Sequence, residues 1–600
     1  MSKPHLVPVD GTPSAPESPH HRNVSAVVAK AQAGESLNAS ETLVDALFAL
    51  GVTHAFGLIG GAIAPFCSAV DESPIALMHF RHEGGAAFAA IELSLATGRP
   101  VVVFATTGPG LTNCITGMIA ARWEGARVIF VSGATASPQR GRWAFQETSA
   151  YTMPSSDLFT AGPLFHFAAM IESPKELELA ITRIAAGLAR PEGFVAHLGF
   201  PMSVQTAPAL TYSPPRIETL APPSCAEIDA IRCARLLAAE PFVIWAGFGA
   251  RLAADELREL ARLSGARVMC SPRAKGVFPE DHPQFLGVTG LGGHERVGVE
   301  LAASPPTRIL VIGSRLGEFT SFWSRDLIPP AGLVHVDVNP DVFGAAYPDV
   351  PTLAVQSEAR AFLRAVIDAW PEEVTATHAS VTPPPTPPHA LTPRDQGAIR
   401  PSFLMGCIQR CVVEATDAVV LTEAGNSFAL GSHHLRFSDP GRYRVSSGYG
   451  AMGHATTGVL GSALGPARKA VAIVGDGAML LANEISTAVQ YGIDAVWIVL
   501  NDARYNMIDQ GMRSIGMTPF GTEIPRADFA AIARAMGGDG VTVGSEGEVE
   551  DALRRAIAAR GPFVVDVDID PSELAPSRGR NSSLVKQGVS STSGATRRAS

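Results

Sequence analysis

Short apolar runs alternate with amphipathic segments along most of this 600-residue chain. Runs such as "PVVVFAT", "RILVIGS" and "AVWIVLND" carry apolar side chains at successive positions, so each predicted strand would be buried on both faces. Strands of this kind, separated by helices, predict parallel sheets that helices cover on both sides. The sequence therefore predicts an α/β fold of doubly wound parallel-sheet domains, which bind ligands at the carboxyl ends of their strands.

Proline-rich stretches divide this pattern into three modules. A chain of this length is too long for one hydrophobic core. The stretches "TAPALTYSPPRIETLAPPS" and "TPPPTPPHALTP" are typical of extended linkers. The two ends of the chain lack hydrophobic periodicity, which is typical of disorder. We expect a disordered arm at 1–35, domains at 36–205, 226–370 and 398–574, a Pro-rich linker at 371–397 and a disordered tail at 575–600.

The composition argues against several classes of partner. The chain has 47 basic and 57 acidic residues, a formal net charge of −10, which disfavours nucleic acid as a partner. No apolar run approaches the roughly 20 residues needed to span a membrane, and the N-terminus lacks the apolar core of a signal peptide. The seven cysteines form no CxxC pair. We expect a cytoplasmic protein that binds neither nucleic acid nor membrane.

An acidic residue follows each of two apolar runs in the third module. Gly475, Asp476 and Gly477 end the run "KAVAIVGDG", and Asp502 ends the run "AVWIVLND", 26 residues after Asp476. Glycine and aspartate are also common in ordinary turns. However, the backbone N–H groups of Gly477 and Ala478 would begin a helix, whose N-terminus favours phosphate. Because Mg²⁺ prefers a few protein oxygens together with substrate phosphates, the two carboxylates predict a Mg²⁺–phosphate site.

These motifs resemble those of thiamine-diphosphate enzymes of the acetolactate synthase (acetohydroxyacid synthase) large-subunit-like family. "GDG…LND" is similar to the diphosphate motif of that family, in which the final pair is commonly Asn-Asn. "GVTHAFGLIGGAIAPF", "HFRHEGGAAFAA" and "ATTGPGLTNCITGMIAA" resemble its pyrimidine-binding domain, and "SSGYGAMGHATTGVLGSALG" resembles its cofactor-shaping loop. The resemblance covers about 40–574 and implies pyrimidine-binding, central and diphosphate-binding domains in that order.

The resemblance implies roles for residues that match its motifs. Glu83 would be the catalytic acid that hydrogen-bonds the pyrimidine ring and activates the cofactor, although an acid at a helix start is also favoured by the helix dipole. Gly60 and Gly61 would let the backbone approach the thiazolium ring. Gln146 would lie near the substrate, unless it is an ordinary surface residue. Met452 would hold the cofactor in its bent form.

The resemblance also implies how the diphosphate and the metal are held. The metal ligands would be Asp476, Asp502 and the backbone carbonyl of Arg504. The cofactor contacts in this module, besides Met452, would come from Gly425, Asn426, Ser427, Gly450, Gly475, Asp476, Gly477, Ala478 and Asp502.

The chain departs from the family pattern at the second-substrate pocket. Where acetolactate synthases carry a tryptophan that limits the acceptor, alignment on Met507 places Gly511. Replacement of an indole by hydrogen would open space and favour a partner bulkier than pyruvate, unless another side chain such as Met512 or Arg513 fills it. We therefore expect Gly60 and Gly511 to line the substrate pocket.

The resemblance implies the reaction class. A Mg²⁺- and thiamine-diphosphate-dependent enzyme would decarboxylate a 2-keto acid and join the remainder to a second carbonyl compound, giving an acyloin or acetohydroxyacid-type product. Two alternatives stay open, a decarboxylase that releases an aldehyde and an inactive cofactor-binding scaffold. "VIGSRLGEF" and "VHVDVNP" resemble regions that hold FAD in some relatives, whereas other relatives keep this domain empty. The family's shared active sites imply a homodimer or homotetramer.

Overall fold

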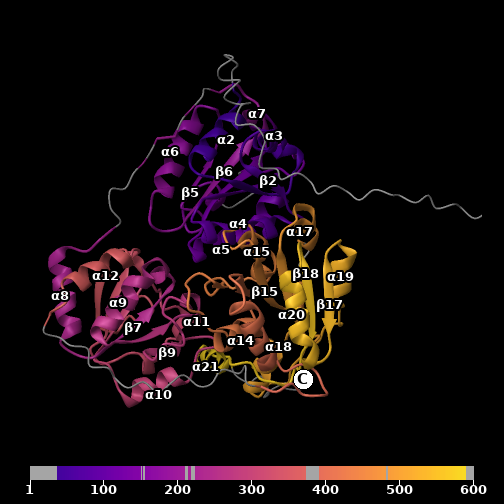
Figure 1. Cartoon of the computed structure of the whole chain (residues 1–600). Coiled ribbons are helices and arrows are strands. Elements are labelled where there is room, and N and C mark those ends of the chain that lie inside the picture. The colour runs from indigo at the N-terminus through magenta and orange to yellow at the C-terminus, as the bar shows by residue number, and fades with distance from the viewer. Residues whose placement is uncertain are drawn as a thin grey trace, which may run out of the picture.

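The described part of the chain contains three six-stranded sheets in which every pair of neighbouring strands is parallel. The computed structural model describes residues 37–149, 152, 156–209, 212, 214–215, 217, 223–372, 391–481 and 484–589. Each sheet lies in one of the three modules that the sequence separated, and helices cover both of its faces (Figure 1). The predicted α/β fold with three doubly wound domains is confirmed. The arm predicted at 1–35 and most of the linker predicted at 371–397 lie outside the described residues.

The N-terminal domain has the strand order β2-β1-β3-β4-β6-β5. Its strands are β1 (His54–Gly57), β2 (Ala76–His79), β3 (Val101–Ala105), β4 (Arg127–Ala134), β5 (Phe167–Met170) and β6 (Phe194–Pro201). Its helices are α2 (Ala39–Ala49), α3 (Ala64–Asp71), α4 (Glu83–Thr97), α5 (Pro109–Glu124), α6 (Glu176–Leu188) and α7 (Met202–Gln205). All residues of β3 and β6 are buried, as expected for continuous apolar strands.

The central domain has the strand order β12-β11-β10-β7-β8-β9. Its strands are β7 (Phe242–Ala246), β8 (Arg267–Cys270), β9 (Phe285–Val288), β10 (Arg308–Ile312), β11 (Leu333–Asp337) and β12 (Thr352–Gln356). Its helices are α8 (Glu227–Ala238), α9 (Ala254–Ser264), α10 (Arg296–Ala303), α11 (Glu318–Ser321) and α12 (Ala359–Asp368). This domain encloses two hydrophobic clusters, one on each face of its sheet, made of its own residues.

The C-terminal domain has the strand order β14-β13-β15-β16-β18-β17. Its strands are β13 (Val419–Thr422), β14 (Tyr443–Val445), β15 (Ala470–Gly475), β16 (Ala495–Asn501), β17 (Asp539–Val543) and β18 (Phe563–Asp568). Its helices are α13 (Pro401–Ile408), α14 (Asn426–His434), α15 (His454–Ala463), α16 (Asp476–Met479), α17 (Ile485–Tyr491), α18 (Asn506–Ser514), α19 (Phe529–Ala535), α20 (Val549–Ala558) and α21 (Arg578–Lys586).

The N-terminal and C-terminal domains share one hydrophobic core. Helix α4 packs along α15 (Figure 1), and a single buried cluster contains side chains of both domains. The helices approach closely because α15 carries glycine at the contact. A Cβ atom at Gly461 would lie 1.9 Å from the Ala89 carbonyl oxygen, and one at Gly458 would lie 2.9 Å from Glu92 Cγ. At the same interface, the buried His454 and Glu92 are joined by a 2.9 Å contact between Nε2 and Oε1.

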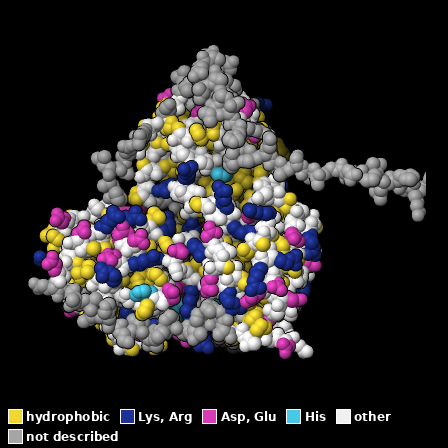
Figure 2. All heavy atoms as spheres, in the orientation of Figure 1, with side chains coloured by type: hydrophobic (Ala, Val, Ile, Leu, Met, Phe, Trp, Pro, Cys, Tyr) yellow, Lys and Arg dark blue, Asp and Glu magenta, His cyan; other side chains and the backbone are white. Residues whose placement is uncertain are grey.

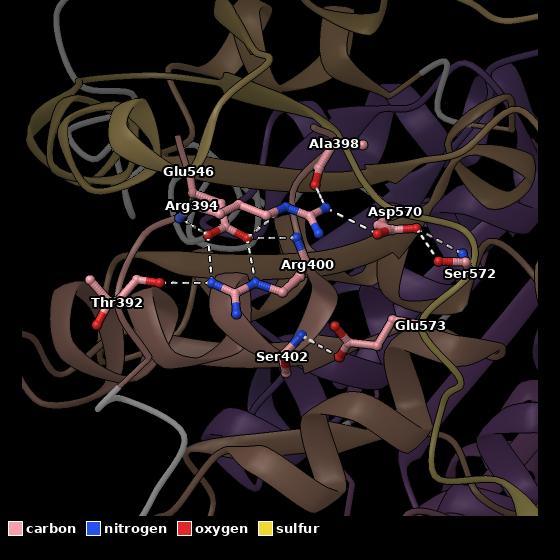
Figure 3. Close-up of polar contacts among 9 residues, drawn as sticks. All are labelled: Thr392, Arg394, Ala398, Arg400, Ser402, Glu546, Asp570, Ser572 and Glu573. Carbon is pink, nitrogen blue, oxygen red and sulfur yellow. Dashed lines mark hydrogen bonds and ion pairs between the residues drawn. The ribbon is translucent and has the colours of Figure 1, made fainter. Parts of the chain in front are cut away.

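The end of the predicted linker is tied to the C-terminal domain (Figure 3). The Arg400 guanidinium meets both carboxylate oxygens of Glu546, at 2.8 Å from Nε to Oε1 and 2.7 Å from Nη2 to Oε2. The backbone N–H of Arg394 donates to Glu546, and its guanidinium pairs with Asp570 at 3.0 Å. The Glu546 side chain is fully buried. These contacts fix both the entry to the C-terminal domain and the segment after β18.

Part of the predicted C-terminal tail is helical. Residues Arg578–Lys586, expected in a disordered tail at 575–600, form α21 instead. This helix lies beside α14, α18 and α11 (Figure 1). It contains few apolar residues, so hydrophobic periodicity could not reveal it. Residues 590–600 of the predicted tail lie outside the described residues.

Basic and acidic side chains are mixed on the face of the molecule that Figure 2 shows. This mixed pattern agrees with the small excess of acidic residues in the sequence. Within the part of the chain that the structure describes, none of the helices has the length and apolarity needed to cross a bilayer.

Candidate active site

The carboxyl edge of the N-terminal sheet buries Glu83. This residue follows β2 as the first residue of α4 and is 5% exposed. Its Oε2 accepts a 3.1 Å hydrogen bond from Asn113 Nδ2 of α5. His82 caps the helix, since its Nδ1 accepts from the Gly84 N–H at 3.0 Å. His82 is thus structural, and Asn113 is a partner of Glu83 that sequence reasoning missed because it lies 30 residues away.

Glu484 holds the start of α4 from the C-terminal domain. Its carboxylate accepts the N–H of Arg81 at 3.1 Å and that of His82 at 3.0 Å. Burial raises the pKa of Glu484, and the bonds from Thr487 and from these N–H groups act in the opposite direction. A Cβ atom at Gly85 would lie 2.7 Å from Glu484 Oε1, so glycine is needed there. The position of Glu83 thus depends on a second acid that no local motif identified.

The other predicted residues of this domain lie at the same sheet edge. Gly60 follows β1, and a Cβ atom there would lie 2.6 Å from Thr106, the residue after β3. At Gly61 a Cβ atom would meet no described atom within 4 Å. The Gln146 Cβ atom would lie 3.0 Å from one built on Gly108, which also follows β3. The structure therefore brings Gly60, Gly61 and Gln146 to the loops that surround Glu83.

Asp476 and Asp502 meet at the carboxyl edge of the C-terminal sheet. Strands β15 and β16 pair in register with Gly475 opposite Leu500, so the residues that follow lie side by side. Both carboxylates are buried. Burial, and then repulsion from Asp476, raise the pKa of Asp502 to about 7. A divalent metal would stabilise two buried acids placed in this way.

The loop after β16 shapes this acidic pair. Ala503 adopts a positive φ of 57°, and the next N–H, that of Arg504, donates to Asp476 Oδ2 at 3.2 Å. The Arg504 carbonyl accepts from the Asn506 N–H at 2.9 Å and retains a second lone pair. Among the described residues, no three His, Cys, Asp or Glu side chains gather as a metal group. A cation here would therefore need backbone and ligand oxygens besides the two carboxylates.

Glycines around the acidic pair leave room for a ligand. A Cβ atom at Gly477 would lie 2.4 Å from the Tyr505 ring, so this position requires glycine. A Cβ atom at Gly475, Gly425 or Gly450 would meet no described atom within 4 Å, and the last two glycines have φ values of 132° and 66°. Ala478 is buried in the single-turn helix α16.

The first turn of α14 and the residues around Met452 complete the edge. Asn426 begins α14, and its Oδ1 has no hydrogen-bond partner among the described residues. The Ser427 hydroxyl donates to the Glu423 carbonyl at 2.8 Å. The Gly450 N–H lies 3.4 Å from Ser446 Oγ, and Met452 is 44% exposed. The predicted residues of this domain therefore surround one edge of its sheet.

Gly511 is in contact with the C-terminal helix. A Cβ atom there would lie 3.2 Å from Arg580 Nη1 and 3.5 Å from Asn581 Oδ1, both of α21. The space that glycine was expected to open is therefore lined by two polar side chains of α21. Sequence reasoning named Met512 and Arg513 as residues that could refill it, and missed this helix.

A cluster of arginines lies at the carboxyl edge of the central sheet. The guanidinium carbons of Arg251 and Arg273 lie 4.2 and 3.8 Å from the centre of the Phe248 ring. The buried Arg444 lies 5.8 Å from the same ring, and its Nε and Nη1 have no hydrogen-bond partner among the described residues. Burial, followed by repulsion from Arg444 and Arg273, lowers the pKa of Arg251 to about 9. Two of these arginines pair with acids, since Arg273 Nη2 lies 2.9 Å from Glu124 Oε2 and Arg444 Nε lies 3.8 Å from Glu92 Oε2.

Family models match all three domains of the chain. The models for thiamine pyrophosphate enzymes match residues 37–153 as the N-terminal TPP binding domain, 232–366 as the central domain and 423–567 as the C-terminal TPP binding domain. A putative acetolactate synthase large subunit of Mycobacterium tuberculosis is 30% identical over 83% of this chain and 91% of its own length. The chain belongs to the thiamine pyrophosphate enzymes of the acetolactate synthase type.

Other relatives in this family cover nearly the whole chain. A probable acetolactate synthase large subunit of Methanocaldococcus jannaschii is 27% identical over 92% of this chain and 95% of its own length. A sulfoacetaldehyde acetyltransferase of Castellaniella defragrans is 28% identical over 88% and 92%, respectively. This acetolactate synthase-like protein is therefore a thiamine-diphosphate-dependent enzyme of the decarboxylase and carboligase class.

Proposed function

We propose that this acetolactate synthase-like enzyme decarboxylates a 2-keto acid and joins the remaining acyl group to a second carbonyl compound. The observation that carries the proposal is the placement of acidic residues at the carboxyl edges of two sheets. Glu83 is buried at the edge of the N-terminal sheet, and Asp476 lies beside Asp502 at the edge of the C-terminal sheet. Thiamine diphosphate, when bound, supplies the electron sink that decarboxylation of a 2-keto acid requires. The protein supplies position and charge.

Each group of the chain has a proposed task. Glu83, oriented by Asn113, would hold a proton at the pyrimidine ring of the cofactor. Asp476, Asp502 and the Arg504 carbonyl would hold Mg²⁺, whose charge relieves the repulsion between the two acids. Gly60, Gly61 and Gln146 would surround the reacting carbon. Met452 would support the cofactor between its two rings.

The test is incubation with pyruvate, Mg²⁺ and thiamine diphosphate, followed by a mass-spectrometric screen of other 2-keto acids in pairs. We expect CO₂ release together with a coupled product that contains both carbon skeletons. Equimolar CO₂ and aldehyde, with no coupled product, would identify the enzyme as a decarboxylase instead. Absence of cofactor-dependent CO₂ release from every 2-keto acid would contradict the proposal.

We propose that the second partner is bulkier than pyruvate, with its size set jointly by Gly511 and α21. Because residue 511 is glycine, α18 has no side chain at this position, and Arg580 and Asn581 line the space beside Gly511. Because the Arg580 side chain is long and flexible, it can move aside more readily than an indole in a packed pocket. A series of 2-keto acid acceptors of increasing size, assayed with one donor, measures where the limit lies.

We propose that the active enzyme is a homodimer or a homotetramer of such dimers. Tyr449, Met452, Leu480 and Leu481 are 40%, 44%, 50% and 50% exposed beside the cofactor residues. Apolar side chains in such a position favour cover by another chain. Glu83 of one chain would then serve the cofactor held by Asp476 of its partner. Light scattering together with activity measurements tests this, since a fully active monomer would contradict it.

For the central domain, we propose two alternatives, FAD or no cofactor. Arginines around Phe248 suit an anion, and Arg444 Nη1 has no hydrogen-bond partner among the described residues, whereas Glu124 and Glu92 pair with Arg273 and Arg444. Denaturation of the purified enzyme, followed by mass spectrometry of the released small molecules, detects FAD. Its absence, with no binding of added FAD, would leave thiamine diphosphate as the sole organic cofactor.

A further inference from the structure

The loop between β14 and α15 (residues 446–453) carries Met452. Two of its glycines, Gly450 and Gly453, adopt positive φ values of 66° and 93°. Inside the loop, the Gly450 N–H donates to Ser446 Oγ over a long distance of 3.4 Å. Because glycine gives a chain additional conformational freedom, contacts with other elements are needed to fix the position of Met452.

A buried acid of the N-terminal domain holds the start of the β14–α15 loop. The Ser446 hydroxyl donates to Glu124 Oε1 at 2.8 Å, and Glu124, the last residue of α5, is 3% exposed. Arg273 of the central domain engages the other carboxylate oxygen of Glu124, at 2.9 Å from Nη2 to Oε2. The neighbouring Trp123 lies against Gly448, where a Cβ atom would lie 3.1 Å from the indole. The end of α5 therefore fixes the first half of the loop.

A second buried acid of the N-terminal domain holds the other end of the loop. His454, the first residue of α15, meets Glu92 of α4 at 2.9 Å from Nε2 to Oε1. Both side chains are 4% exposed. The His454 ring also packs on Phe88 of α4, with ring centroids 5.1 Å apart. Because Met452 lies two residues before His454, this contact sets where the end of the loop lies relative to α4.

The surroundings of His454 and Glu92 favour a charged pair. Burial opposes a charge on His454, but the hydrogen bond and the charge of Glu92 outweigh it and raise the pKa of His454. The charges of Glu124 and Glu423 act in the same direction. Burial alone would raise the pKa of Glu92, whereas the hydrogen bond from His454 and the charge of Arg444 lower it. A charge-assisted hydrogen bond is roughly twice as strong as a neutral one, so this contact is suited to holding the loop.

We propose that Glu92 and Glu124 are positioning residues that hold the β14–α15 loop at both ends and thereby fix the position of Met452. This inference rests on the proposed role of Met452 as a support of the rings of thiamine diphosphate. It adds two residues of the N-terminal domain that act through the loop and not by contact with the cofactor. Loss of either attachment should therefore affect the part of the cofactor that Met452 supports.

The test compares the binding of thiamine diphosphate with that of inorganic diphosphate, each in the presence of Mg²⁺. Both ligands use the contacts to the metal and to the diphosphate, and only thiamine diphosphate has rings that Met452 can support. The measured quantity is the ratio of the two dissociation constants, obtained by calorimetry on the full-length protein. The variants are Ser446→Ala and His454→Leu, which remove the loop's hydrogen bonds to Glu124 and to Glu92, respectively.

We expect each variant to weaken the binding of thiamine diphosphate by about tenfold relative to inorganic diphosphate, the scale of one charge-assisted hydrogen bond. Ser446→Thr and His454→Gln keep a donor and should restore most of the ratio. Unchanged affinity for inorganic diphosphate shows that a variant is folded, and if His454→Leu does not fold, Ser446→Ala decides by itself. A ratio within about twofold of the wild-type value in either folded variant would overturn the proposal.

Ser462→Ala is the matched control. Ser462 lies on α15, about two turns beyond His454, and contacts the same acid at 3.5 Å from Oγ to Glu92 Oε2. It is buried in the same interface between α4 and α15, so its replacement tests the packing of the two helices without touching the loop. Ser462→Ala should leave the ratio unchanged. An equal reduction in Ser462→Ala and His454→Leu would mean that Glu92 acts through helix packing, which contradicts the proposal.

Amide hydrogen exchange of the cofactor-free protein separates this inference from the proposed function. Residues 446–453 should exchange faster in Ser446→Ala and His454→Leu than in wild type, and at the wild-type rate in Ser462→Ala. Unchanged exchange in the first two variants would mean that the acids do not hold the loop, and the inference is wrong while the proposed function stands. Met452→Ala should lower the ratio as the loop variants do. If it leaves the ratio unchanged, the proposed role of Met452 is wrong, and the inference fails with it.

Discussion

Asp476 and Asp502 are buried carboxylates that follow two paired strands, and burial together with repulsion from Asp476 raises the pKa of Asp502 to about 7. The family pattern has an amide in place of the second acid. Asp502→Asn should remove the repulsion and also a charged metal ligand. We therefore expect a metal-free variant that is at least as stable as wild type and binds Mg²⁺ about tenfold more weakly. Thermal unfolding and Mg²⁺ titration measure the two effects, and identical titration curves would exclude Asp502 as a ligand.

Glu83→Gln should bind thiamine diphosphate and lose most turnover. The amide keeps the shape of the side chain, including contact with Asn113, but cannot hold a proton in the same way. Loss of a positioned acid–base group typically costs about 10²- to 10⁴-fold in rate. Calorimetry measures cofactor binding, and Glu178→Gln, at an exposed position of α6, is the control. Near-wild-type activity in Glu83→Gln would mean that the catalytic assignment is wrong.

Co-expression of two inactive variants tests which chains form a site. If Glu83 and Asp476 of different subunits serve one cofactor, a hybrid dimer of Glu83→Gln and Asp476→Asn has one intact site and one site with both changes. We expect each variant alone to be inactive and the hybrid to recover up to about half of the wild-type activity per dimer. Because sites built within one chain would each carry one change, an inactive hybrid would contradict the shared-site arrangement.

Gly511→Trp should displace α21. An indole cannot occupy the space next to Arg580, whose Nη1 lies 3.2 Å from the Cβ position, whereas the methyl group of Gly511→Ala requires a small shift of a flexible side chain. We expect faster trypsin cleavage within α21 and a preference for smaller acceptors in the tryptophan variant. The alanine variant should resemble wild type in both assays. An unchanged cleavage rate and acceptor preference in Gly511→Trp would show that position 511 lies outside the pocket.

Glu546→Gln should destabilise the fold in a pH-dependent way. Burial alone would raise the pKa of Glu546, but hydrogen bonds from Arg400 and from the N–H groups of Arg394 and Arg400 lower it to about 2, from an ordinary value of 4.5. A lowered folded-state pKa contributes stability above about pH 4.5 that is lost as the pH falls towards about 2. We expect the variant to lose about 2 kcal/mol in free energy of unfolding at pH 7.

Urea denaturation at several pH values measures this difference. The difference in free energy of unfolding between wild type and Glu546→Gln should become progressively smaller below about pH 4.5. Glu240→Gln, at an exposed position of the central domain, should show no such dependence. If the difference in free energy of unfolding is the same from pH 7 to pH 3, the Arg400–Glu546 pair stabilises the fold through packing and not through its charges.

Sequence patterns were sufficient for the sheets and for residues that follow strands. The continuous apolar runs that became β3, β10 and β16 are buried at nearly every position, so local hydrophobicity alone identifies them. Asp476 and Asp502 were placed together correctly because parallel strands end at one edge. These are consequences of local pattern and of the geometry of parallel sheets.

Contacts between distant segments escaped the sequence analysis. Asn113 and Glu484 act on Glu83 and on the start of its helix from other elements, and no spacing rule links them. Helix α21 was missed because polar contacts to Glu318 hold it, while sequence patterns register apolar periodicity. Because α21 was missed, the contact that its residues make with Gly511 was missed as well.

The core that α4 and α15 share has a consequence for how the protein unfolds and diversifies. Because Gly461 and Ala89 meet with no room for a side chain, neither cofactor-binding domain can keep its interior intact without the other. The two should therefore melt as one cooperative unit. In recombination between related genes, they must be inherited together.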